Sequence, residues 1–200
     1  VSDLALKALP GGGIGSVLDA GSGEGYYLRH LSAVAGDTGL ALIGVDISKW
    51  AVLAAAKQDK QTRWVVGSNA NLPVLPESLD LVLCLFGFPV YSEFARVLKP
   101  GGQVIQVDAG ADHLRELREV IYPEVKPPGD FESAAPEGFR QLDSTVVRFP
   151  LTLPDQASIA DLLAMTPHLY RASAEGLERA AALESLEVTV DATLKRFEKL

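Results

Sequence analysis

A glycine-rich turn is the part of the sequence whose residue types and spacing indicate chemistry. An apolar run that ends in an acid passes directly into the turn, giving Val17-Leu18-Asp19-Ala20-Gly21-Ser22-Gly23-Glu24-Gly25. Glycine lets the backbone approach a ligand more closely than a residue with a Cβ does, and such turns lie where a strand passes into a helix. The pattern predicts a nucleotide-type pocket at the carboxyl edge of a parallel sheet.

The glycine spacing differs from two familiar nucleotide motifs. A dinucleotide fingerprint needs a glycine at position 26, where this chain has Tyr26. The sequence also lacks the G-x-x-x-x-G-K-[ST] pattern of a triphosphate loop. NAD, FAD and nucleoside triphosphates are therefore disfavoured, and a plain tight turn stays open as an alternative at this point.

A second acid supports a nucleoside ligand. Asp46 follows the next apolar run, where a carboxylate can accept hydrogen bonds from the two vicinal hydroxyls of a ribose. The alternative is that Asp46 caps the following helix, although Ser48 is better placed for capping. An adenosine moiety is the ligand that the two motifs together indicate.

Alternating strands and helices must position these residues. Strands are expected at 16–19, 40–45, 64–66, 79–86 and 103–107, with helices between them at 26–34, 49–58 and 91–98, the last before a Lys99-Pro100-Gly101-Gly102 turn. This rhythm predicts an α/β fold with a doubly wound, mostly parallel sheet in a single domain, 1–200. The remaining expected elements are helices at 2–9 (capped by Ser2), 112–121, 156–165 (capped by Asp155) and 174–183, and strands at 145–153 and 186–197. The Pro- and Gly-rich stretch 122–142 is predicted to be irregular and is a candidate lid.

Composition limits the partners and the compartment. The 200 residues include 18 Lys and Arg against 26 Asp and Glu, and a formal charge of -8 does not indicate nucleic-acid binding. No apolar run approaches the roughly 20 residues that cross a bilayer, so no membrane partner is predicted. Cys84 is the single cysteine, and no pair of histidines has metal-ligand spacing, so neither a disulfide nor a metal is expected. A cytoplasmic location fits these features, and a homodimer is a candidate assembly.

Successive motifs resemble those of the class I S-adenosylmethionine-dependent methyltransferases. In the family's order they are the glycine turn, Gly44-Val45-Asp46-Ile47-Ser48, Leu72-Pro73, Leu79-Asp80-Leu81-Val82 and Arg96-Val97-Leu98-Lys99-Pro100-Gly101-Gly102. The resemblance implies a seven-stranded Rossmann-like sheet and S-adenosyl-L-methionine as the cofactor. It implies that the cofactor's methionine end lies against Asp19, Gly21, Gly23, Glu24 and Gly25, its ribose on Asp46, and its adenine between Ile47 and the Ser68-Asn69 turn.

A closer similarity covers nearly the whole chain. It is to the bacterial ribosomal RNA large subunit guanine-N1 methyltransferase A family, and it is carried above all by Met165-Thr166-Pro167-His168-Leu169-Tyr170-Arg171. The resemblance implies methylation of N1 of a guanine in ribosomal RNA, with Gly23, Glu24 and His113 contacting the cofactor. That family begins with a cysteine-rich zinc ribbon that engages RNA. Since this sequence starts at Val1 without those cysteines, we expect that such a segment has been removed.

Candidate catalytic and substrate residues follow from this family and from the chemistry of guanine. N1 carries a proton that must leave, so His113 is the candidate base, the alternative being that it only holds the cofactor carboxylate. Phe86 follows the fourth strand, where such methyltransferases place residues that face the methyl group. His168, Tyr170 and Arg171 are candidates for stacking on a splayed base, the alternative being a structural corner.

Two other functions stay open from the sequence. A small-molecule methyltransferase needs no explanation for its acidic surface. A cofactor-binding module without turnover would result if the stretch 122–142 blocked the pocket. Tyr26 and Tyr27 are candidates for a wall of the cofactor site, although Tyr27 fits a helix core equally well.

Overall fold

The computed structural model describes the chain except for residues 11–14, 37–38 and 126–133. The packing of the backbone divides it into two compact units. The first unit comprises 1–108, 133–145 and 194–200, and the second comprises 109–132 and 146–193. The single-domain organisation stays a prediction, and each unit is described by itself.

Within the described residues the strands form a seven-stranded sheet in the order β3-β2-β1-β4-β5-β7-β6. The bounds are β1 Ser16–Ala20, β2 Ala41–Asp46, β3 Arg63–Val66, β4 Leu79–Leu85, β5 Leu98–Ala109, β6 Phe139–Leu153 and β7 Leu186–Lys199. The pairs β3-β2, β2-β1, β1-β4 and β4-β5 are all parallel. The predicted doubly wound, mostly parallel α/β sheet is confirmed.

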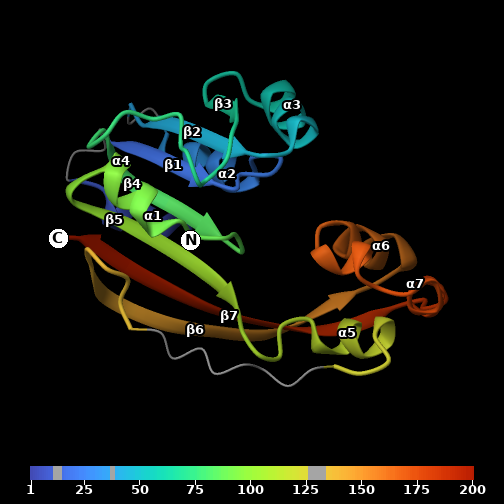
Figure 1. Ribbon diagram of the computed structural model, residues 1–200. Coiled ribbons are helices and arrows are strands. Elements are labelled where there is room, and N and C mark those ends of the chain that lie inside the picture. Colours follow the sequence, from blue (N-terminus) through green and yellow to red (C-terminus); the bar gives the residue numbers. More distant parts are fainter. Residues whose placement is uncertain (11–14, 37–38, 126–133) are drawn as a thin grey trace. The chain divides into compact units, whose positions relative to one another are not determined.

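The parallel register brings the carboxyl ends of the central strands to one edge. Asp19 on β1 pairs with Gly44 on β2 and with Leu83 on β4. Figure 1 shows β1, β2 and β4 side by side with their arrows pointing the same way. Residues that follow these strands therefore meet at the same edge, as the glycine turn and Asp46 do.

Helices of the first unit are α1 Ser2–Ala8, α2 Tyr26–Ala35, α3 Lys49–Gln58 and α4 Tyr91–Val97. The predicted cap of α3 is present, because Ser48 Oγ accepts a hydrogen bond from the Ala51 N–H at 3.3 Å. The predicted cap of α1 is wrong. Val1 occupies the cap position, and the Ser2 hydroxyl bonds instead with His30 Nδ1 at 2.8 Å. The Ser2 hydroxyl thus bonds with a side chain distant in sequence in place of a backbone N–H of its own helix.

Two local expectations at the strands are also corrected. The expected turn at 99–102 is part of β5, where the register moves from Leu79–Leu98 to Leu81–Gln103, so these residues form a bulge within the strand. Strand β6 starts at Phe139, inside the stretch predicted to be irregular. Pairing with β7 stabilises the start of β6 although Pro136 and Gly138 precede it. The Leu200 N–H, for example, donates to the Gly138 carbonyl at 3.0 Å. Of the candidate lid, 126–133 lies outside the described residues.

The second unit packs small helices on its own core. They are α5 Arg115–Ile121, α6 Gln156–Ala164, the 3-10 turn η1 Pro167–Tyr170 and α7 Ala174–Ala181. The apolar side chains of Leu117, Ile121 and Ile159 are buried between them. Asp155 caps α6 as predicted, its Oδ1 accepting the Ser158 N–H at 2.7 Å. No helix in the described ranges combines the length and apolar character needed to cross a membrane.

A tryptophan determines how closely the glycine turn can pack on β2. A Cβ built on Gly25 would lie 2.1 Å from the Trp64 ring, and one built on Gly44 would lie 2.3 Å from it. The indole is held in place because its Nε1 donates to the Asp59 carbonyl at 3.0 Å. These two glycines are therefore needed for packing, in addition to any role in ligand approach.

Gly44→Ala should destabilise the protein by about 1–3 kcal/mol, because the added methyl group overlaps the indole. Urea unfolding would measure the loss. The matched variant is Gly44→Ala combined with Trp64→Leu, in which the smaller side chain makes room for the methyl group. The two changes should then cost less together than the sum of each alone, and strict additivity would contradict the packing argument.

Candidate functional site

The glycine turn presents open space beside left-handed backbone. Gly21 has φ of 102° and Gly23 has φ of 53°, conformations that side chains with a Cβ rarely adopt. No heavy atom of the described residues lies within 4 Å of a Cβ built on either glycine. The Gly21 and Ser22 N–H groups anchor the turn on the Val45 carbonyl at 2.8 and 3.0 Å. A ligand can therefore approach this backbone.

Asp19 is buried beneath the turn without a partner. Its side chain is 1% exposed, and neither carboxylate oxygen has a hydrogen-bond partner among the described residues. The Ser22 hydroxyl is unpartnered in the same sense. Burial, and secondly the charge of Asp46, raises the pKa of Asp19 to about 7. Such a group is costly unless a ligand brings a hydrogen-bond donor or a cation.

Asp46 links the turn to the start of α3. Its Oδ2 accepts the Gly23 N–H at 2.8 Å, and its Oδ1 accepts the Ser48 N–H at 2.8 Å. Asp46 does not itself cap α3, because Ser48 is the N-cap; the carboxylate holds Ser48 and shapes the glycine turn. Each oxygen retains a second lone pair, so ribose binding stays a prediction. The neighbouring Ile47 is 79% exposed, as a side chain that covers a ligand ring would be in its absence.

The turn after β3 is tied to the same edge. Asn69 Nδ2 donates to the Ala20 carbonyl at 3.4 Å and to the Phe88 carbonyl at 3.3 Å. Ser68 Oγ accepts the Ala70 N–H at 3.2 Å. The amide of Asn69 thus joins the end of β1 to the loop after β4, and the residues predicted to contact adenine lie beside those predicted to contact ribose.

Phe86 has a strained backbone at the end of β4. Its φ is 54°, a value uncommon for a residue with a Cβ, and its N–H is fixed on the Val107 carbonyl at 2.8 Å. The ring is 48% exposed. Backbone strain of this kind clusters at functional sites, so the geometry supports the interpretation of Phe86 as a residue that faces the substrate.

Asp108 is a candidate group that the sequence reasoning did not single out. The amide nitrogen of Gln106 donates to both Asp108 oxygens at 2.9 and 2.8 Å, and the Tyr91 hydroxyl donates to the Gln106 carbonyl. Lys195 Nζ lies 3.8 Å away. An acid two residues after a buried glutamine, at the end of a strand, was the signal available in the sequence.

The thiol of Cys84 is influenced by the charges of both Asp19 and Asp108. Burial, and then the charges of Asp108 and Asp19, raises the pKa of the Cys84 thiol to about 12. The thiol is therefore protonated at neutral pH and is unsuited to nucleophilic chemistry. Both carboxylates act on this one buried sulfur from the carboxyl ends of β1 and β5.

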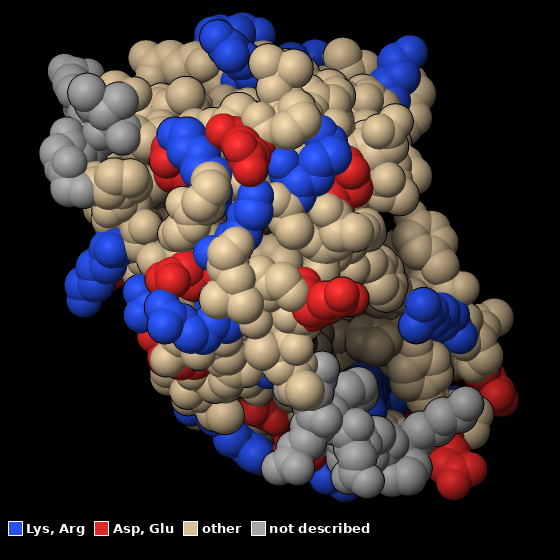
Figure 2. All heavy atoms as spheres, turned by 60° about the vertical axis from the view of Figure 1, so that its left-hand side comes forward, with Lys and Arg blue, Asp and Glu red and all other residues tan. Residues whose placement is uncertain are grey.

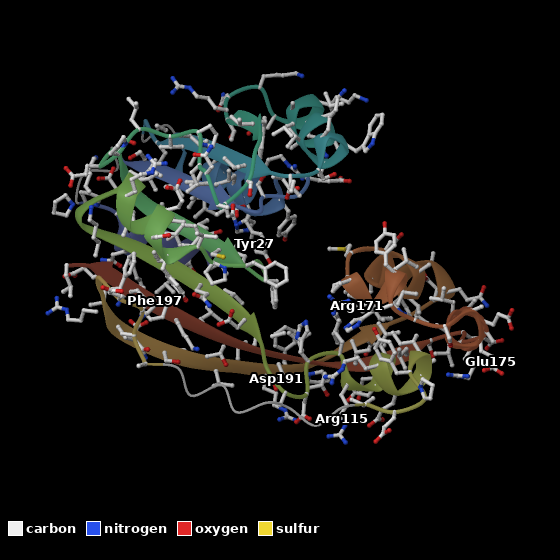
Figure 3. The ribbon with its side chains drawn as sticks, viewed as in Figure 1. Tyr27, Arg115, Arg171, Glu175, Asp191 and Phe197 are labelled. Atoms are coloured by element: carbon white, nitrogen blue, oxygen red, sulfur yellow. The ribbon has the colours of Figure 1, made fainter. Side chains whose placement is uncertain are left out.

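A half-open cavity of about 240 Å³ adjoins the start of α2. It is lined by Val1, Ser2, Asp3, Tyr26, Tyr27 and His30. Burial, followed by the charge of Asp19, raises the pKa of Tyr27, so the phenol lies within the influence of the buried acid. Figure 3 labels Tyr27 near the carboxyl ends of the parallel strands. The role of Tyr27 in the wall of the cofactor site stays a prediction, because none of the other residues that line this cavity is among those predicted to contact the cofactor.

His113 belongs to the second unit. Its Nδ1 accepts the Asp191 N–H at 3.3 Å, so the neutral ring carries its proton on Nε2. Burial lowers the pKa of His113, while the negative charge of Asp191 favours the protonated form. A neutral ring whose Nδ1 lone pair is occupied is suited to donating a hydrogen bond from Nε2. The geometry favours the alternative interpretation of His113, a ligand-holding group, over that of a base.

The second unit brings His113 close to two other predicted residues. His168 Nδ1 bonds with the Tyr122 hydroxyl at 2.9 Å. Burial, and then the charges of Arg118, Arg171 and His113, lowers the pKa of His168. Tyr170 is 87% exposed, and Figure 3 labels Arg171 and Asp191 in this unit. The predicted cofactor residues other than His113, together with Phe86, lie in the first unit.

Comparison with known proteins identifies the domain that holds the glycine turn. Residues 17–102 match the sequence family described as a methyltransferase domain. This segment, which holds the glycine turn and Asp46, is similar to methyltransferase domains. It has the fold of YcgJ from Bacillus subtilis, with a TM-score of 0.59 and 21% identity over 99% of this chain and 97% of that one. An S-adenosylmethionine-dependent methyltransferase from Methanosarcina mazei has the same fold, with a TM-score of 0.61 and 16% identity over 98% and 97%.

Curated relatives of the methyltransferase domain have several substrates in their names. YxjB of Bacillus subtilis, provisionally named a 23S rRNA (guanine-N(1)-)-methyltransferase, is 35% identical over 88% of this chain and 64% of its own length. The 23S rRNA (guanine(748)-N(1))-methyltransferase of Streptomyces fradiae is 32% identical over 58% and 41%. A demethylmenaquinone methyltransferase of Oceanobacillus iheyensis is 34% identical over 54% and 50%. The chain thus spans less than two thirds of each of these relatives.

The residues of the methyltransferase domain fit the cofactor that this family implies, S-adenosyl-L-methionine. Its ammonium group is the cationic donor that the unpartnered Asp19 carboxylate lacks. The open backbone at Gly21 and Gly23 leaves room for the methionine end. The exposed Ile47 beside Asp46 matches an adenine ring next to a ribose. Donors, acceptors and apolar surface therefore occur in the order in which the cofactor presents its groups.

The buried Asp19 predicts an unusual dependence of stability on pH. Because its folded pKa is about 7 and its unfolded value 3.8, the unfolded chain binds fewer protons between these limits. The free energy of unfolding should therefore fall by up to about 4 kcal/mol as pH rises from 4 to 7, and then level off. Asp19→Asn should remove this slope in urea titrations of the ligand-free protein.

The same substitution should weaken cofactor binding by roughly 10- to 100-fold, since a charged hydrogen bond is lost. Calorimetry with S-adenosylmethionine would measure this change. A variant that kept the slope would assign it to another titrating group, and a variant that bound the cofactor as the parent does would remove Asp19 from the cofactor site.

Proposed function

We propose that this protein is an S-adenosylmethionine-dependent methyltransferase that methylates N1 of a guanine in large-subunit ribosomal RNA. The observation that carries the enzymatic part is the buried, unpartnered Asp19 beside the open glycine turn. The choice of substrate is supported by the names of YxjB and the Streptomyces fradiae enzyme. A zinc ribbon outside this chain, a cytoplasmic location and a homodimer belong to the same proposal.

The proposal assigns each part of the cofactor to residues of this chain. Asp19 receives the ammonium group, with Gly21, Gly23, Glu24 and Gly25 around the methionine end. The cofactor supplies a methyl group on a sulfonium leaving group, so the protein's task is to orient and deprotonate the substrate. Asp46 holds the ribose, while Ile47, Ser68 and Asn69 hold the adenine. His113 donates a hydrogen bond to the cofactor's carboxylate.

The substrate residues are proposed to be Phe86, His168, Tyr170 and Arg171. Exposed aromatic rings and a guanidinium group can stack on a base that has left its helix. The segment after β4, Phe86-Gly87-Phe88-Pro89, lacks the amide or acid that orients an exocyclic amino group in related enzymes. A ring nitrogen is therefore the favoured methyl acceptor.

Asp108 is proposed to take the N1 proton. It lies at the carboxyl end of β5 in the unit that holds the glycine turn, and the Gln106 amide fixes both of its oxygens. A positioned carboxylate can accept the proton as the carbon–nitrogen bond forms. His113 is less suited, since its Nδ1 already accepts a hydrogen bond.

A small-molecule methyltransferase is the second candidate function. The demethylmenaquinone methyltransferase of Oceanobacillus iheyensis and the formal charge of -8 favour it. The two candidates share the cofactor site and differ in the methyl acceptor.

The test of the proposed function uses radiolabelled S-adenosylmethionine and unmodified large-subunit ribosomal RNA. We expect label in the RNA and a primer-extension stop at one guanine, because a methyl group on N1 blocks base pairing. Asp19→Asn is the control, and at a cofactor concentration equal to the parent's Kd it should lower the initial rate of RNA labelling by roughly 5- to 50-fold, in line with its weaker cofactor binding. Cofactor binding without labelled RNA would transfer the assignment to the small-molecule enzyme.

Asp108→Asn should lower kcat by about 10²- to 10⁴-fold near neutral pH while cofactor affinity stays the same. The remaining rate should rise with pH, because N1 must then ionise by itself before it attacks. The matched control is Asp143→Asn, which removes a half-buried carboxylate on β6 that pairs with Arg196 of β7. A pH profile that coincides with the parent's would remove Asp108 from the mechanism.

A further inference from the structure

The chain's acidic character does not extend to α3 and the strand that follows it. Residues 47–66 contain four cations, Lys49, Lys57, Lys60 and Arg63, against the single carboxylate of Asp59. All four cations are exposed, whereas Asp59 Oδ1 accepts the N–H groups of the turn that follows α3. This part of the surface is therefore cationic in a chain whose formal charge is -8.

The surrounding surface has a different pattern. The cations on β5, β6 and β7 are paired with acids, for example Lys99 with Asp80 at 2.7 Å and Arg140 with Glu198 at 2.8 Å. On the face shown in Figure 2, blue and red side chains alternate over the middle of the molecule, while blue ones lie along the upper edge without red neighbours. Unpaired cations are available to an anionic partner, since no acid has to be displaced.

An exposed tryptophan lies among these cations. Trp50 is 79% exposed and Leu53 is 42% exposed, on the side of α3 opposite the buried Val52 and Ala55. Positions 50, 53 and 57 share one helix face, which places Lys57 on the same side as the indole. Lys60 folds back to donate to the Ala56 carbonyl, so its charge stays at the end of α3. Tryptophan is enriched in binding interfaces relative to the rest of protein surfaces.

We infer that this cationic face, formed by Lys49, Trp50, Lys57, Lys60 and Arg63 and called the α3 surface, binds single-stranded RNA that flanks the methylated base. The inference rests on the proposed function, because it assumes an RNA substrate. A base stacks on the Trp50 indole, and the cations contact the phosphates on either side of it. Contacts of this type tolerate any sequence and position the strand, while the pocket selects the base.

Charge complementarity selects RNA over a second copy of this chain. Two α3 surfaces brought face to face would oppose eight cations, which disfavours a symmetric dimer through this face. A polyanion neutralises the same charges and releases counterions. The α3 surface begins next to Ile47 and Asp46, so RNA bound there lies at the edge of the sheet that holds the cofactor residues.

Tryptophan fluorescence tests the inference directly, because the chain has two tryptophans in different surroundings. Trp50 is exposed, whereas Trp64 is held against Gly25 and Gly44 and reports unfolding. The probe is a twelve-nucleotide oligoadenylate titrated into the full chain at low salt. We expect quenching of the emission in the parent. Trp50→Phe and Trp50→Ala should both remove most of the quenching, because Trp64 is then the tryptophan that remains to emit.

Affinity is then measured by anisotropy of the labelled oligonucleotide. Trp50→Ala should raise Kd by about 5- to 100-fold. Lys57→Glu should also weaken binding and reduce the slope of log Kd against log salt by about 0.7 or more. Lys7→Glu on α1 makes the same change of charge outside the α3 surface and should have a much smaller effect on both quantities.

Three results would overturn the inference. Trp50 emission that is unchanged while the oligonucleotide binds would place RNA elsewhere. If Lys7→Glu and Lys57→Glu changed Kd and its salt dependence equally, the net charge of the protein would explain the binding, without a specific α3 surface. Emission that changes with protein concentration alone would assign the surface to self-association. Methylation of ribosomal RNA by the parent is measured separately. If the parent methylates RNA but Trp50 emission does not change on oligonucleotide binding, only the inference about the α3 surface is refuted. If Trp50 emission changes but the RNA is not methylated, only the proposed function is refuted.

Discussion

Two carboxylates at the ends of neighbouring parallel strands are the constraint on which the candidate site depends. Asp46 accepts the N–H groups of Gly23 and Ser48, so a single side chain holds the glycine turn and the residue that caps α3. Its charge adds to the burial that raises the pKa of Asp19. The sheet register leaves no freedom to separate the two acids, because Asp19 is paired with Gly44, two residues before Asp46. A cationic group of a ligand would offset the repulsion between the two carboxylates and the burial of Asp19. The backbone around the two acids already has its shape before the ligand binds.

The same arrangement costs stability when the site holds no ligand. A buried carboxylate without a partner is among the more expensive features that a small protein can keep. Binding a ligand that interacts only with the folded state recovers that cost. The strained Phe86 directly follows β4, which pairs with the strand that holds Asp19, and the acid at the end of β5 lies one strand further, so the less favourable features of the first unit gather at one edge of its sheet. Such an edge is typical of a protein whose function requires a prepared site.

Net charge is a poor guide to partners when the charges are segregated. Interactions between exposed charges are screened beyond about 8–10 Å at physiological salt, so a strand of RNA responds to the nearest cations and not to the total. In this chain most basic side chains of the β5, β6 and β7 region are paired with acids, whereas those of α3 and β3 are not. The composition therefore gives only the total charge, whereas the fold determines which charged side chains lie together on the surface that a partner contacts.

The sequence by itself determined the order of strands and helices, the glycine turn, and the caps Ser48 and Asp155, because periodicity and capping depend on residues close together in the chain. It also placed Asp46 correctly at the end of β2. Only the tertiary structure decided that Ser2 bonds with His30, that residues 99–102 bulge within β5, and that β6 begins at Phe139. It alone placed Asp108 beside Gln106 and the Asp191 N–H on His113. Those outcomes depend on partners distant in sequence or on neighbouring strands, whose hydrogen bonds and packing outweigh the local preferences that a sequence displays.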